Sequence, residues 1–253
     1  MRSSTHQSAT AHKTCSRNER ARVPSSGPRN LRCLGGTLIP RIARWFATPS
    51  LVSVMPLKGN IPGQTPLDDL SGLIPKHLRT REQLDTAEAE NIRKATIKYL
   101  AAAPTARNAP FDYPWLLRLH REMYGDVWSW AGQLRVSQTN IGTLPQGIEV
   151  ELHGLLHDLR AWIDSQIPLL EQAVRLHHRA VSIHPFTNGN GRWSRMLANI
   201  WLRLHGTDLI EWPETTVGSS STIREEYLAA LRSADRGDYA PLIALHERFR
   251  RQG

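Results

Sequence analysis

Hydrophobic residues recur along this chain at the three- and four-residue spacing of amphipathic α-helices. In the clearest case, one apolar arc collects Trp193, Met196, Leu197, Ile200, Trp201 and Leu204. The same spacing predicts helices over residues 80–103, 113–124, 148–163, 171–183, 191–204, 221–234 and 239–251. This pattern predicts an all-α fold.

One internal segment departs from the helical pattern. Residues 136–150 contain β-branched residues, two glycines and Pro145, a composition that favours a short β-hairpin. We therefore predict a helical bundle that carries one short β-hairpin.

The pattern is weak at the start of the chain. Residues 1–54 are rich in Ser, Thr and Arg, and they indicate a basic low-complexity extension. A disordered tail, a targeting peptide and sequence upstream of a true start at Met55 are all consistent with this composition. Residues 55–79 then form an extended, proline-containing lead-in, and residues 80–253 are predicted to form the folded domain.

The charge lies mainly in the extension. The net charge is +9, but residues 1–54 hold nine Lys and Arg against one acid, whereas the other 199 residues hold 23 basic and 22 acidic groups. The folded part therefore gives no reason to expect a nucleic-acid partner. No run of about 18 apolar residues predicts a membrane span. The two cysteines, Cys15 and Cys33, lie outside the predicted core, which favours a reducing cytoplasm.

Candidate chemistry is concentrated between two of the predicted helices. Pro185 ends the first helix directly after His184, and a glycine-containing loop with Gly189 leads into the second helix. Backbone N–H groups at a helix N-terminus bind anions such as phosphate. Arg192 and Arg195, one turn apart, would add charge-assisted hydrogen bonds. The stretch therefore predicts a titratable base beside an anion-binding loop.

These residues resemble the signature of the Fic/Doc family, His-x-Phe-x-(Asp/Glu)-Gly-Asn-Gly-Arg-x-x-Arg. Residues 184–195 agree with every fixed position except the acidic one, where this chain has Asn188. The Asn188 variant, Trp193 and the lead-in resemble the subgroup called mobile mystery protein B. The resemblance implies a Fic-type helical bundle that transfers AMP from ATP onto a Ser, Thr or Tyr hydroxyl of a target protein.

In this resemblance His184 is the catalytic base, and the nucleotide is bound by Asn188, Gly189, Asn190, Gly191, Arg192 and Arg195. ATP is then the substrate, with Mg²⁺ as its usual companion. Asn188 puts the metal in doubt, because an amide oxygen is a weaker ligand for Mg²⁺ than a carboxylate. Two alternatives use the same residues: a hydrolase that removes AMP, and a catalytically weak nucleotide-binding or toxin-like module.

A second resemblance lies in the first predicted helix. Residues 86–91 match the family's inhibitory pattern, (Ser/Thr)-x-x-x-Glu-(Gly/Asn), with Thr86, Glu90 and Asn91 at its fixed positions. The resemblance implies that Glu90 forms a salt bridge with Arg195 and blocks the seating of the nucleotide. The alternative is an ordinary exposed glutamate.

Two further site predictions follow from the family. The predicted hairpin resembles the flap that binds the target's extended backbone, with Ile141, Gly142 and Thr143 beside nucleotide and target. Tyr227 lies on a helix that resembles the one closing the adenine pocket. A plain surface hairpin and an ordinary core tyrosine are the alternatives.

Overall fold

The computed structural model describes residues 70–217 and 221–251. The basic extension and most of the lead-in lie outside the described residues. Within the described part the chain is helical, and the β-structure there consists of two isolated bridges, Leu73 with Trp128 and Ile210 with Arg250. The predicted all-α fold is confirmed.

The predicted helices form with ends within three residues of the expected positions. Their bounds are α1 Arg81–Leu100, α2 Tyr113–Tyr124, α3 Ile148–Asp164, α4 Leu169–Ile183, α5 Asn190–Leu204, α6 Glu214–Val217, α7 Thr222–Ala234 and α8 Ala240–Arg248. The four-residue α6 was not predicted, because a single turn of sequence is too short to show a period. No described helix is long and apolar enough to cross a membrane.

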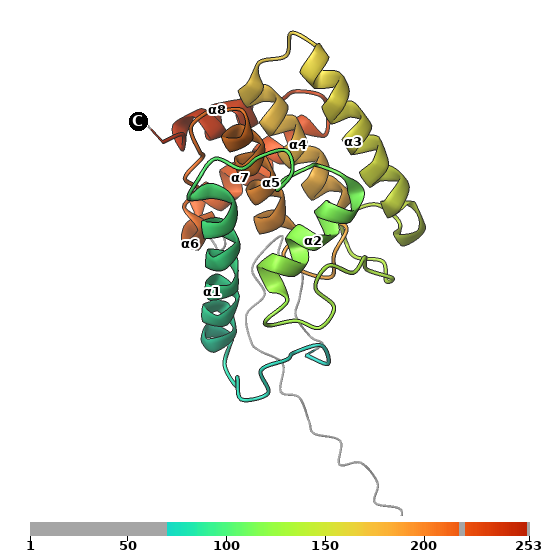
Figure 1. Cartoon of the computed structure of the whole chain (residues 1–253), viewed down its shortest axis with the longest axis vertical. Helices are drawn as coiled ribbons and strands as arrows, with labels where there is room; N and C mark the ends of the chain where they lie inside the picture. The colour runs from blue at the N-terminus through green and yellow to red at the C-terminus, as the bar shows by residue number, and fades with distance from the viewer. Residues whose placement is uncertain (1–69, 218–220, 252–253) are drawn as a thin grey trace, which may run out of the picture. The chain divides into compact units, whose positions relative to one another are not determined.

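Helices α4 and α5 lie at the centre of the bundle (Figure 1). α3 and α8 pack on α4, α1 packs on both α2 and α5, and α7 packs on α8. Because α5 has neighbours on several sides, it is buried around most of its circumference, including Ser194 and Arg195. The side of α5 opposite its apolar arc is therefore closed to solvent at Arg195.

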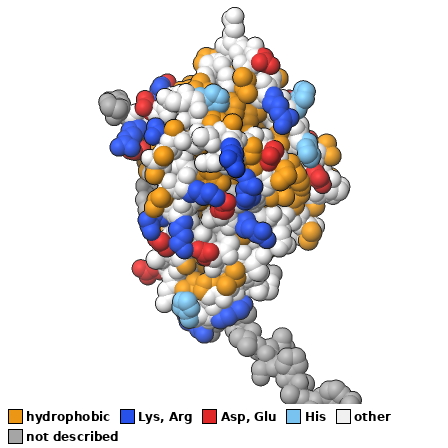
Figure 2. All heavy atoms as spheres, viewed as in Figure 1, with side chains coloured by type: hydrophobic (Ala, Val, Ile, Leu, Met, Phe, Trp, Pro, Cys, Tyr) orange, Lys and Arg blue, Asp and Glu red, His pale blue; other side chains and the backbone are white. Residues whose placement is uncertain are grey.

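Acidic and basic side chains both occur on the face drawn in Figure 2, with hydrophobic side chains between them. The near-neutral charge of the chain after residue 54 accords with this mixture.

The predicted β-hairpin does not form. Residues 136–144 are bends and irregular backbone, and a 3₁₀ turn, η1, covers Pro145–Gly147 before α3 begins. Inter-strand hydrogen bonds are replaced by those of one side chain. Arg135 donates hydrogen bonds to the carbonyls of Ser137 and Thr143 on the two arms of the loop. The segment is a loop held together by one arginine, and we refer to residues 136–147 as the flap loop.

Candidate active site

His184 is fixed by the end of its own helix and by the flap loop. It is the C-terminal cap of α4, in the left-handed conformation with φ 53° and ψ 58°. Gly142 of the flap loop lies so close that a Cβ atom there would be 2.5 Å from the Cβ of His184. A non-glycine residue with positive φ is strained, and such residues occur most often at functional sites.

Arg135 joins the flap loop to the His184 segment. Its Nε donates a hydrogen bond of 2.7 Å to the carbonyl of His184, and its backbone N–H donates one of 2.9 Å to Pro185. The backbone N–H of Thr143 bonds to the Ile183 carbonyl at 3.1 Å. A buried arginine that donates to carbonyls keeps its whole positive charge next to the histidine.

This environment sets the protonation state of His184. Burial lowers the pKa of His184 to about 4, and the charge of Arg135 acts in the same direction, while a hydrogen bond to the backbone of Val181 raises it. The imidazole is therefore neutral at pH 7. A neutral imidazole can accept a proton from a hydroxyl group.

The anion-binding loop is built from Phe186 to the start of α5. Gly189 has φ 80° and precedes the first residue of α5. The Asn190 side chain closes the loop, since it accepts from the Phe186 N–H at 2.9 Å and donates to the Phe186 carbonyl at 2.8 Å. The loop therefore holds its shape, and the N-terminus of α5 begins at its tip.

Asn188 supports this loop from within. Its side-chain oxygen accepts the Gly189 N–H at 2.7 Å, and its carbonyl is 3.0 Å from Nε2 of His120. Because the Gly132 N–H donates to Nδ1 of His120, the ring proton must be on Nε2 and is donated to Asn188. Burial lowers the pKa of His120 to about 3, so this histidine is neutral.

The donors around Asn188 do not fit a protein-held Mg²⁺. The Asn188 oxygen is uncharged and already accepts a hydrogen bond, whereas Mg²⁺ favours anionic oxygen. The described residues contain no cluster of three or more His, Cys, Asp or Glu side chains able to hold a metal ion.

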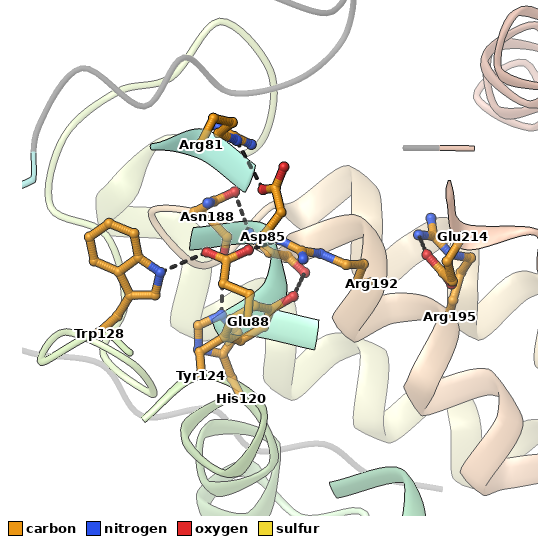
Figure 3. Close-up of polar contacts among 11 residues, drawn as sticks. Arg81, Asp85, Glu88, His120, Tyr124, Trp128, Asn188, Arg192, Arg195 and Glu214 are labelled. Atoms are coloured by element: carbon orange, nitrogen blue, oxygen red, sulfur yellow. Dashed lines mark hydrogen bonds and ion pairs between the residues drawn. The ribbon is translucent and has the colours of Figure 1, made fainter. Parts of the chain in front are cut away.

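Arg192 is paired with a buried glutamate of α1. Its Nη2 lies 2.6 Å from one oxygen of Glu88, whose other oxygen accepts a 2.7 Å bond from the indole N–H of Trp128 (Figure 3). Glu88 is only 1% exposed, and the guanidinium also lies over the Tyr124 ring. Burial opposes the charge of Arg192, but Tyr124 and Glu88 outweigh it and raise the pKa of Arg192.

Arg195 is paired with a different carboxylate. Nε donates 2.8 Å to one oxygen of Glu214 on α6, and Nη2 donates to the other, which makes a two-pronged ion pair. The guanidinium lies beside the rings of Trp212 and Tyr227, with centroid distances of 5.9 Å and 5.7 Å. Both arginines of the signature therefore already hold anionic oxygens.

The predicted salt bridge between Glu90 and Arg195 is wrong. Glu90 is 51% exposed and pairs with Arg93 one turn along α1. Asn91 is buried and bonds to the backbone of Glu122 and Asp126, while Thr86 bonds to its own helix at Glu82. The inward face of α1 carries Leu84, Glu88, Asn91, Ala95 and Tyr99. Glu90 is two residues beyond Glu88 and so points away from the bundle.

The flap-loop predictions divide into two kinds. Gly142 and Thr143 do lie beside the His184 segment, through the close approach and the hydrogen bond given above. Ile141 is exposed at the surface, together with Val136 and Leu144. Contacts of these residues with nucleotide or target stay a prediction.

Tyr227 is buried, and its hydroxyl is 2.9 Å from Nε2 of His177. The ring packs edge-on against Trp212. The predicted contact with a base stays untested, but the hydroxyl is engaged by His177 and the ring lies next to the Arg195 guanidinium.

Three residues of this site were missed in the sequence. Glu88 could have been found, because it lies four residues after Leu84 and three before Asn91, the spacing of the inward face of α1. Arg135 and Glu214 carry no such signal, since one lies in a loop and the other in a single helical turn. Their roles depend on contacts across long sequence separations.

Comparison with known proteins gives a consistent result. "Protein adenylyltransferase fic-1" of Caenorhabditis elegans is 30% identical over 133 residues, which cover 51% of this chain and 25% of that protein. "Protein adenylyltransferase Fic" of Aedes aegypti is 30% identical over 155 residues, or 59% of this chain and 30% of that protein. The matched part is thus less than a third of the length of these relatives.

Solved structures share the fold. Fic-1 (residues 134–508) from C. elegans superposes with a TM-score of 0.54 and 25% identity over 70% of this chain and 51% of that chain. The BepC protein of Bartonella tribocorum with bound AMPPNP gives a TM-score of 0.54 and 17% identity over 71% of this chain and 91% of that chain.

The sequence from the loop before α2 into the last turn of α5 matches the model of a known protein family, and it contains the His184 loop and both arginines. Residues 110–202 of this chain match the model of the Fic/DOC family.

Proposed function

We propose that this chain is a protein nucleotidyltransferase that moves AMP from ATP to a Ser, Thr or Tyr hydroxyl of a target protein. The observation that carries the proposal is the arrangement around the loop: a neutral, buried His184 precedes the N-terminus of α5, and Arg192 and Arg195 of that helix already hold carboxylates. A nucleotide phosphate has the same charge sign and the same oxygen acceptors as those carboxylates. The names of the adenylyltransferase relatives support the proposal.

The reaction is an in-line displacement at the α-phosphorus. The target hydroxyl oxygen bonds to the α-phosphorus while its proton passes to His184, and the bond to the α–β bridging oxygen breaks. Pyrophosphate leaves with that electron pair. The N–H groups of residues 189–191 and the guanidinium of Arg192 offset the negative charge that grows on the phosphoryl oxygens. Because the described donors around Asn188 do not fit Mg²⁺, no step is assigned to a protein-held metal.

The target protein docks at the flap loop in this proposal. Val136, Ile141 and Leu144 are exposed large hydrophobic residues on the loop that Arg135 fastens to His184. An extended segment of the target could pair with the irregular backbone of this loop as an added strand. The attacking hydroxyl would then be presented to the histidine.

Glu88 restrains the enzyme at rest. It is buried and accepts a hydrogen bond from Trp128, and it is paired with the Arg192 guanidinium, the group that is proposed to bind a phosphate oxygen. A nucleotide must displace this carboxylate from Arg192 before it binds productively. Restraint by Glu88 through Arg192 therefore takes the place of the predicted restraint by Glu90 through Arg195.

The test compares the wild type with Glu88→Gln, Glu90→Gln and His184→Ala, using ATP labelled at the α-phosphate. The Glu88→Gln side chain keeps an acceptor for Trp128 but loses the charge, so labelling of the protein or of added acceptor proteins should rise about 10- to 100-fold, as expected for removing one charge-assisted bond. Glu90→Gln is the matched control on the same helix and should label like the wild type. His184→Ala should not label.

Each other outcome contradicts a stated part of the proposal. Label in His184→Ala would refute the base. A rise in Glu90→Gln without one in Glu88→Gln would refute the restraint. ATP binding without label in any variant would identify a binding module, and release of AMP from a labelled protein without any transfer would identify a hydrolase.

A further inference from the structure

A continuous set of buried hydrogen bonds lies behind Arg195. The Arg195 guanidinium lies 5.7 Å from the centroid of the Tyr227 ring, and the Tyr227 hydroxyl is 2.9 Å from Nε2 of His177. Nδ1 of His177 is 3.1 Å from Nε2 of His246, and Nδ1 of His246 is 2.8 Å from the carbonyl of Leu242. The four side chains come from α5, α7, α4 and α8, so the set crosses the whole C-terminal half of the domain.

The acceptor at the α8 end fixes the direction of every bond. The Leu242 carbonyl can only accept, so Nδ1 of His246 carries the proton, and Nε2 of a neutral His246 can only accept. His177 must then donate from Nδ1, which leaves its Nε2 to accept from the Tyr227 hydroxyl. All the bonds therefore run from Tyr227 toward α8 without a conflict.

The set is uncharged. Burial lowers the pKa of His246 to about 4 and lowers the pKa of His177 well below its ordinary value, and the Arg195 charge acts in the same direction on both. Arg195 therefore has two unlike partners. Tyr227 is neutral, buried and fixed from behind, whereas Glu214 is charged, 47% exposed and sits on the single-turn helix α6.

We propose that Tyr227, His177 and His246 form a positioning relay that holds Arg195 in place when Glu214 releases it to a nucleotide phosphate. The inference rests on the proposed function only in identifying phosphate as the incoming anion. A neutral ring suits the task, since it positions the guanidinium without cancelling its charge. Simple packing would not call for these residues, because burying two imidazoles and a phenol costs free energy unless each polar atom is paired.

The first test needs no activity. Long-range ¹H–¹⁵N spectra of the full chain at pH 7 distinguish the two neutral tautomers of a histidine. His177 and His246 should both be Nδ1–H tautomers. An Nε2–H tautomer or a charged imidazole at either position would overturn the relay.

The second test measures binding of a non-hydrolysable ATP analogue by calorimetry. Tyr227→Phe keeps the ring against Trp212 but removes the hydroxyl that bonds to His177, and His246→Leu removes the acceptor of His177. Each should weaken binding about five- to tenfold, the size expected for the net contribution of one ordinary hydrogen bond. His246→Gln restores an acceptor and should bind within about twofold of the wild type.

His178→Gln is the matched control, because His178 is the next residue of α4, is also buried, and bonds to Asp235 outside the relay. Thermal unfolding of every variant shows that it is folded. If His246→Gln binds as weakly as His246→Leu, or Tyr227→Phe binds like the wild type, the relay is refuted. Absence of AMP transfer alongside the expected tautomers and affinities would instead refute the proposed function and leave the relay standing.

Discussion

At the scale of single residues, Gly189 shows how closely the anion-binding loop is packed. Its φ of 80° is in the left-handed region, and a Cβ there would lie 2.5 Å from the Tyr124 ring. The Tyr124 hydroxyl in turn donates to the Gly189 carbonyl at 3.4 Å. Glycine is therefore required both by conformation and by space.

Gly206 supplies a matched control, because it has a similar φ of 73° but no neighbour within 4 Å of the added Cβ. Gly206→Ala should lower the free energy of unfolding by about 1 kcal/mol, the cost of the left-handed backbone. Gly189→Ala should lower it by about 1–3 kcal/mol more because of the clash with Tyr124. Urea unfolding measures both, and equal losses would contradict the packing argument.

The residues of the signature could be predicted from the sequence, because they lie within one short stretch. The partners of its arginines could not be predicted in the same way. Glu90 fitted a six-residue pattern, but side chains two positions apart on a helix face different directions, and Glu88 is the one that faces inward. Glu214 reaches Arg195 only because the chain after α5 turns back over that helix.

At the scale of elements, the flap loop is an irregular segment whose two arms are joined by hydrogen bonds from one side chain, Arg135. The sequence composition indicated a hairpin, since β-branched residues and glycines are common to hairpins and to tight loops alike. In the structure the Arg135 guanidinium takes two of the loop's carbonyls, and the Thr143 N–H bonds to Ile183 outside the loop.

Arg135→Met should therefore loosen the flap loop and abolish transfer. The change removes several hydrogen bonds from a charged group, so the free energy of unfolding should fall by about 2–4 kcal/mol. Hydrogen exchange should rise at the amides of residues 135 and 143, which bond to Pro185 and Ile183. Arg118→Met, at an exposed position of α2, is the control and should change neither quantity. Unchanged exchange at those two amides would contradict the assigned role.

At the scale of the whole molecule, the helices and their order could be predicted because each buries a stripe of apolar residues with a clear period. The polar interior could be predicted only in part, since helical spacing places a histidine on an inward face but does not identify its hydrogen-bond partner. His120, His177 and His246 are all buried among the helices and all neutral. Each of them bonds to a group from a distant part of the chain or to its own helix.

These histidines make the fold sensitive to acid. Their pKa values lie below the ordinary 6.5, at about 3 for His120 and about 4 for His184 and His246. Between pH 6.5 and 4 the unfolded chain binds more protons than the native one. The stability that depends on these neutral histidines is therefore fully present above about pH 6.5 and is lost as the pH falls. The loss is about 1.4 kcal/mol per histidine for each pH unit in that window.

Urea unfolding at pH 7 and at pH 5 tests this dependence. The wild type should lose several kcal/mol, and His246→Gln should lose less by the share of one histidine. A free energy of unfolding that is the same at both pH values would show that the buried histidines are not neutral in the native state.

The central claim is that the His184 site cleaves ATP between the α- and β-phosphates and transfers the AMP part to a protein hydroxyl. The most direct measurement incubates the Glu88→Gln protein, alone and with heat-inactivated extract proteins as acceptors, with ATP labelled either at the α- or at the γ-phosphate. The account predicts protein-bound label from α-labelled ATP only, dependent on His184. Label from γ-labelled ATP, or α-label that persists in the Glu88→Gln, His184→Ala double variant, would contradict it.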